Sequence, residues 1–381
     1  MGNELTRQSN FELLRIISMF MIVLHHMMYH GVMQGFKGNQ FYSLWQSGPE
    51  LNKFFSIFYF PGGEVGIALF FMISGYFLIK SDSIRIKKIL LPTFFYSVFT
   101  VVLYFIVSFG TKFLCFRNPY DYMDRLEVSK EVLFNILAPL RSEQFWFVSA
   151  YILLIIAKPV YNIFLNRLNK NGFIVFLTFL FVFGMLFSRC YNLVWGYTQA
   201  FFYYALGAYL KKYIQVDMIR KKIVLALAVV LWCLYVIVRY EWQNMALDGL
   251  LGSACEMFVC LYPSCVCVAL ISIALFVFFI KIDMGCSRVV NILASTTFGV
   301  YLLHEGFFTR VILWDVIVGV HSNLYEQPYF PLIAPIVALA VFLGCSLIEL
   351  FRMHTFKPVE KKIDILLDKI EQNMFVEGKN A

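Results

Sequence analysis

The sequence predicts an all-helical protein that crosses a membrane about ten times. Of its 381 residues, 60% are apolar and 15% are charged, whereas about 25% of the residues in a soluble globular domain are charged. Its apolar runs reach the roughly 20 residues that a helix needs to span a bilayer. They lack the alternation of apolar and polar residues that barrel strands show. This composition excludes a soluble enzyme, a disordered protein and a secreted disulfide-rich domain.

The spans follow from the apolar runs and from the breakers between them, and each must be helical because a bare polar backbone is too costly in lipid. The expected ranges are 11–30, 61–79, 89–110, 145–166, 172–188, 198–212, 222–239, 255–280, 289–309 and 328–351. The sixth is short, which leaves a tilted or partly re-entrant segment open. We expect one membrane domain over 1–351, then a cytoplasmic tail, 352–381, with a short amphipathic helix on the membrane surface.

The basic residues indicate the orientation. Placing the N-terminus in the cytoplasm puts about twice as many Lys and Arg in the internal segments as in the external ones, which is the bias that membrane proteins show. Both termini are therefore expected inside. The net charge of +8 has the same origin, so we expect membrane lipid and no nucleic acid as a partner. The nine cysteines include no C-x-x-C pair and predict neither a disulfide framework nor a zinc site.

The first span carries ionisable residues where a membrane makes them costly, which marks a candidate functional site. Arg15 and His26 share one helix face and stand about 16 Å apart along the axis, so that one elongated ligand could contact both. His30 lies one turn beyond His26. Simpler interpretations stay open: a snorkelling Arg15, and a His26 that bonds to a neighbouring helix. A metal site on the two histidines is a third, but the sequence offers no further ligand cluster, so no metal is expected.

Three other places carry polar residues of interest. Glu64, at the outer end of the second span, is expected either to orient a histidine or bind a hydroxyl, or to be a solvated helix-end carboxylate. The internal residues Arg85, Lys87 and Lys88 suit the phosphates of a cytosolic donor or lipid headgroups. In the ninth span, His304 follows Tyr301 at the depth of His26. The external loop 111–144 is a lid, a substrate platform or simply a loop.

These motifs, in this order, resemble the acyltransferase-3 family of bacterial integral membrane O-acyltransferases. The most specific similarity is an arginine, ten residues and a histidine in the first span, which places Arg15 and His26 in the family positions. The other similarities are the 70–77 stretch, the basic run that ends at Pro92, the Phe-Trp-Phe of 145–147 and the Tyr-Leu-Leu-His of 301–304.

The resemblance implies a stand-alone enzyme of the bacterial cytoplasmic membrane. Such an enzyme moves an acyl group, usually acetyl, from cytosolic acetyl-CoA to hydroxyls of a surface or lipid-linked glycan. Arg15, Arg85, Lys87 and Lys88 are then expected to bind the donor, and Glu64 and His30 to bind the acceptor. The oligomeric state stays open.

His26 is expected to act as the general base on the acceptor hydroxyl. His304 or Tyr301 would orient the acceptor or donate a hydrogen bond to the oxyanion, and a covalent acyl-histidine relay is also open. Two alternatives remain. One is a membrane transporter with intramembrane charges. The other is an unrelated membrane-bound O-acyltransferase, in which the late histidine, His304, is the essential one.

Overall fold

The computed structural model describes residues 8–34, 45, 47–81, 83–84, 86–121, 123–141, 143–187, 195–215, 219–247 and 262–376. Throughout these residues the regular elements are helices and no strand is present, which confirms the predicted all-helical class. The helices are α1 (Ser9–Met28), α3 (Glu50–Tyr59), α4 (Gly62–Leu78), α5 (Lys87–Phe113), α6 (Arg125–Leu137), α7 (Trp146–Arg167), α8 (Lys170–Phe179), α10 (Trp195–Tyr213), α11 (Lys221–Leu247), α13 (Tyr262–Ile280), α14 (Arg288–Ser295), α15 (Thr297–Glu305), α16 (Phe307–Val311) and α17 (Phe330–Val376).

Every predicted span overlaps helix, but not every one forms a single long helix. Within the described ranges, six helices are long and apolar enough to cross a membrane, and two shorter apolar helices, Lys170–Leu186 and Cys265–Ile280, accompany them. The predicted ninth span is divided into α14, α15 and α16, with breaks at Thr296 and Gly306. The protein is therefore a multi-pass helical membrane protein, and the count of about ten crossings stays a prediction.

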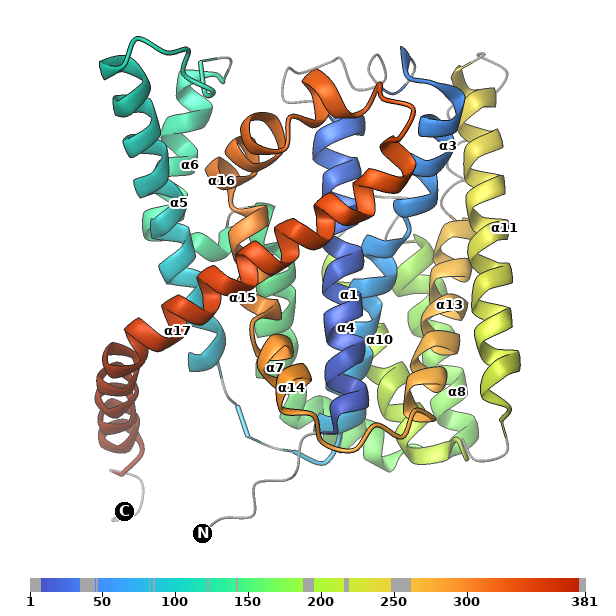
Figure 1. Cartoon of the computed structure of the whole chain (residues 1–381). Coiled ribbons are helices and arrows are strands. Elements are labelled where there is room, and N and C mark those ends of the chain that lie inside the picture. The colour runs from blue at the N-terminus through green and yellow to red at the C-terminus, as the bar shows by residue number, and fades with distance from the viewer. Residues whose placement is uncertain are drawn as a thin grey trace.

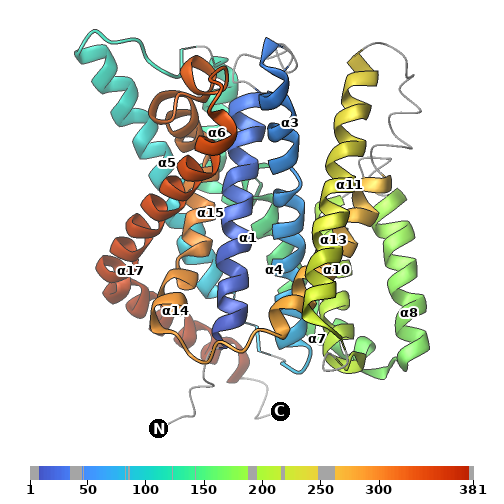
Figure 2. The same ribbon diagram turned by 45° about the vertical axis from the view of Figure 1, so that its right-hand side comes forward.

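Helix α1 runs through the middle of the bundle in both views (Figures 1 and 2). It packs against α4, α14, α17 and α15, and α4 in turn packs against α10. Glycine makes the contact between α4 and α10 close. A Cβ atom on Gly75 would overlap the backbone carbonyl of Tyr204, and one on Gly207 would overlap that of Met72. The central position of α1 places the side chains of its polar face inside the protein.

The last helix, α17, crosses one face of the bundle obliquely and ends at the same end of the molecule at which α1 begins (Figure 1). It is continuous from Phe330 to Val376, so the helix expected in the tail is an extension of the last predicted span as far as Val376. The start of α1 and the end of α17 thus lie at the same end of the molecule, at separate places (Figure 1). Which side of the membrane they occupy stays a prediction.

Candidate active site

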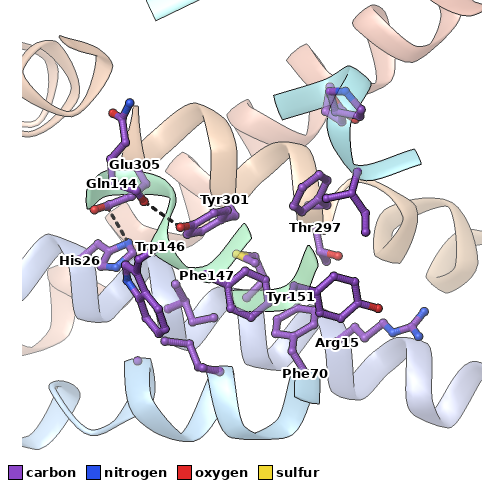
Figure 3. A pocket seen from close by; sticks show the side chains of 18 of the residues that line it. Arg15, His26, Phe70, Gln144, Trp146, Phe147, Tyr151, Thr297, Tyr301 and Glu305 are labelled. Carbon is purple, nitrogen blue, oxygen red and sulfur yellow. Dashed lines mark hydrogen bonds and ion pairs between the residues drawn. The ribbon is translucent and has the colours of Figure 1, made fainter. Parts of the chain in front are cut away.

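A cavity of about 1470 Å³ lies beside α1 and is lined by side chains from α4, α5, α7, α15 and α17 as well. It brings together six residues that the sequence singled out: Arg15, His26, His30, Glu64, Lys88 and Tyr301. Between Arg15 and His26 its wall is aromatic, with Phe70, Phe147 and Tyr151 (Figure 3). The two ends of the cavity are lined by charged side chains, and the stretch between them is lined by apolar ones.

His26 is the centre of a buried polar cluster. Its Nδ1 lies 2.8 Å from Nε2 of His304 and 3.0 Å from Oε2 of Glu305. The same carboxylate oxygen lies 3.1 Å from Nε2 of His30, and its other oxygen is 3.8 Å from Nη1 of Arg310. His304 is 0% exposed, His30 2% and Glu305 8%. Residues 278 positions apart in the sequence, His26 and His304, therefore share one hydrogen-bonded cluster.

The hydrogen-bond partners assign the protons on the two histidines that touch. Nδ1 of His304 lies 2.5 Å from the carbonyl oxygen of Val300, and because a carbonyl only accepts, this nitrogen carries the proton. Nε2 of His304 is then an acceptor and receives the Nδ1–H of His26, which Glu305 also accepts. His26 is thus left with its lone pair on Nε2, the nitrogen that a general base would use.

Glu305 is the residue whose role the sequence did not reveal. Helical geometry turns consecutive residues by about 100°, so Glu305 and its neighbour His304 are not expected to meet the same partner. In the structure both nevertheless contact Nδ1 of His26. Glu305 is the last residue of α15, and Gly306 after it leaves the helical conformation with ψ 132°. The signal in the sequence was an acidic residue directly after a membrane histidine and directly before a glycine.

Side chains from other elements stabilise this break. The carboxamide oxygen of Gln144 accepts the backbone N–H of Phe307, and the hydroxyl of Thr100 accepts those of Phe308 and Thr309 at 3.1 and 3.2 Å. Three backbone N–H groups that a broken helix would leave unpaired in the membrane are therefore satisfied. The hydrogen bonds fix the end of α15, and with it the position of Glu305.

The remaining predicted residues have different surroundings. Tyr301 lines the cavity, and its hydroxyl donates to the backbone carbonyl of Gln144 at 2.8 Å. His304 does not line the cavity and lies behind His26. Lys87 begins α5 but is not among the cavity residues, whereas Lys88 is. Arg85 lies outside the described residues.

Arg15 lines the cavity and also pairs with Glu12 one turn earlier, with 3.0 Å between Nη1 and Oε1. Its side chain is 35% exposed, so one edge of the guanidinium remains accessible. Arg15 therefore faces the cavity while it is paired with Glu12.

A metal ion is a further chemical possibility for the His26 cluster. Ligand atoms of His26, His304 and Glu305 all lie within 4.8 Å of one another. Two nitrogens that bind one Zn²⁺ at about 2.0–2.1 Å in tetrahedral geometry are about 3.3 Å apart, however. The 2.8 Å between the two imidazoles fits a direct hydrogen bond instead.

The chain matches one family of known proteins. A family model described as an acyltransferase domain, that of the acyltransferase-3 family, matches residues 8–350. A search of curated proteins and a search of solved structures found no match to the chain. The matched region contains α1, the whole His26 cluster and every cavity-lining residue up to Glu349. The chain belongs to the acyltransferase-3 family, which supports an acyltransferase activity in a multi-pass membrane protein.

Proposed function

We propose that the protein transfers an acetyl group from cytosolic acetyl-CoA to a hydroxyl of a surface or lipid-linked glycan. One observation supports this above all. The cavity connects a histidine whose Nε2 is available as a base to a distant end lined by Arg15 and Lys88, and an aromatic wall joins the two. That arrangement of basic, aromatic and imidazole side chains along the cavity suits an extended molecule with phosphates at one end and a thioester at the other.

The reaction follows from the proton assignment. Nε2 of His26 takes the proton of the acceptor hydroxyl as its oxygen attacks the thioester carbonyl. The C–O bond forms, the C–S bond breaks, and the leaving thiolate of CoA receives the proton from the imidazolium. Glu305, 3.0 Å from Nδ1 of His26, stabilises the positive charge that the ring carries between these steps.

His304 acts through His26 in this proposal. Because its Nδ1–H is committed to Val300, its Nε2 can only accept, and this holds the proton of His26 on Nδ1. His304 is therefore a positioning residue. The oxyanion-stabilising role considered for Tyr301 would require its hydroxyl to leave the carbonyl of Gln144.

The other end of the cavity suits a polyhydroxyl acceptor. Carboxylates of Glu127 and Glu131 on α6 and the guanidinium of Arg310 line it, together with the indole of Trp146. Carboxylates accept hydrogen bonds from sugar hydroxyls, and an indole face offers an apolar surface on which a sugar ring can stack. We thus propose that α6, from the external loop 111–144, forms part of the acceptor site.

The test uses the purified protein in lipid nanodiscs with acetyl-CoA labelled in the acetyl group. We expect release of free CoA that depends on the added glycan fraction, with the label recovered on the glycan. The His26→Ala variant should lose this transfer while it remains monodisperse. If the wild type neither binds CoA nor transfers the label, but moves a solute across liposome membranes, the transporter interpretation replaces the enzyme.

A further inference from the structure

The end of the cavity remote from His26 is lined by residues of α17 that lie beyond the predicted membrane domain. Arg352, His354 and Lys357 contribute there, opposite Arg15 of α1 and Lys88 of α5. The sequence placed these α17 residues in a surface tail, because hydropathy falls after residue 351. The structure instead places them on the wall of the cavity that holds His26.

Buried charges and stacked rings fix this part of α17 against α5. The hydroxyl of Tyr96 donates to Oε2 of Glu349 at 2.6 Å, and Nε and Nη2 of Arg352 donate to the same carboxylate at 2.7 and 2.9 Å. The rings of Phe95 and Phe356 meet edge to face with their centroids 4.7 Å apart. A surface helix held only by lipid would need none of these contacts.

The cations at this end differ in their partners. Arg15 pairs with Glu12, and Arg352 pairs with Glu349 and Glu360. Those two guanidiniums are therefore neutralised, and the second carboxylate on Arg352 adds one negative charge.

Lys88 and Lys357 are exposed and form no ion pair within the described part of the chain. Lys88 precedes Phe95 by seven residues, close to two helical turns, so it lies on the same face of α5. Lys357 directly follows Phe356, which packs on Phe95. The contact between α5 and α17 therefore holds two ammonium groups without an ion-pair partner at one end of the cavity, whose paired residues there are Arg15, Arg352, Glu12, Glu349 and Glu360. His354, also exposed, is one turn before Lys357.

We propose that Lys88 and Lys357, assisted by His354, bind the phosphate groups of the CoA donor, so that the extension of α17 is part of the donor site. The proposal rests on the proposed acetyl-CoA-dependent function. Uncompensated ammonium groups attract phosphate oxygens, and a cavity with apolar walls strengthens that attraction. A lipid headgroup offers the same phosphate chemistry, but it does not extend through the aromatic part of the cavity toward His26.

The experiment compares wild type, Lys88→Gln, Lys357→Gln and the double variant in nanodiscs of neutral phosphatidylcholine. Lys362→Gln is the matched control, since Lys362 is exposed on the same helix and does not line the cavity. Two quantities are measured: the equilibrium Kd for CoA, and KM and kcat for acetyl-CoA. Each single variant should raise both Kd and KM about 3- to 10-fold and leave kcat unchanged, because the reacting atoms are remote. The double variant should raise Kd and KM further than either single variant, and the control should keep the wild-type values.

An unchanged Kd for CoA in the double variant would overturn the inference. A second arm repeats the assay in nanodiscs that contain anionic phosphatidylglycerol. In one outcome the variants bind CoA normally, but their activity no longer depends on anionic lipid. That outcome would show that the lysines bind lipid headgroups, and it would also overturn the inference. If the wild type binds CoA through these lysines but transfers no acetyl group, the proposed function fails while the phosphate site stands.

Discussion

The contact between Glu305 and His26 gives the sharpest prediction about the chemistry. Replacing Glu305 by Gln keeps the size of the side chain but removes the negative charge 3.0 Å from Nδ1 of His26. With an effective dielectric constant of about 20, Coulomb's law gives about 5 kcal/mol for that charge and an imidazolium at this separation. The amide retains a hydrogen bond and the cluster can relax, so we expect a loss of about 3–4 kcal/mol, equivalent to a 10²- to 10³-fold lower kcat.

The amide also affects the proton on His26. An NH₂ group that faces Nδ1 would favour the tautomer with the proton on Nε2, which removes the base. Neither effect reaches the distant donor end, so the Kd for CoA should stay within about twofold of wild type. Glu326→Gln, a change of the same kind at an exposed position outside the cavity, is the control. A Glu305→Gln enzyme that retains half of the wild-type kcat would refute the role given to this carboxylate.

Two further predictions concern the helix contacts that support the site. Gly75→Ala should prevent stable folding, because the added methyl group would overlap the carbonyl of Tyr204. Gly110→Ala is the control and should be tolerated, because nothing lies within 4 Å of a Cβ atom built at Gly110. Size-exclusion chromatography of the solubilised variants compares the two. Gln144→Ala should lower the free energy of unfolding by about 1–3 kcal/mol, because the N–H of Phe307 loses its buried acceptor. The midpoint of thermal unfolding in detergent should therefore fall. An unchanged midpoint would contradict the role given to Gln144 at the break after α15.

The polar face of α1 could be predicted because it depends on one helix alone. Helical periodicity places Arg15, His26 and His30 on one face, and all three line the cavity. The general depth of His304 also followed from the position of its span, and in the structure His304 contacts His26. These features need only the rise and turn of a helix and the thickness of a bilayer.

The features that need knowledge of helix packing were not accessible from the sequence. Glu305 meets His26 across the contact between α15 and α1, and Gln144 and Thr100 support the end of α15 next to it from distant parts of the chain. The contribution of α17 to the cavity depends on its oblique path to α5 and on buried charges that hydropathy counts as solvent-facing. The division of the predicted ninth span into α14, α15 and α16 was not predicted for the same reason.

We propose above all that His26 is the general base for transfer of an acetyl group to a surface glycan. The most direct test of this proposal is the O-acetyl content of purified cell-wall and capsular glycans, measured by NMR in a deletion strain that carries either the wild-type gene or the His26→Ala variant at equal membrane levels. We predict an acetyl signal that the wild type restores and the variant does not. Equal acetyl signals from the two strains would contradict the account and remove His26 from the chemistry.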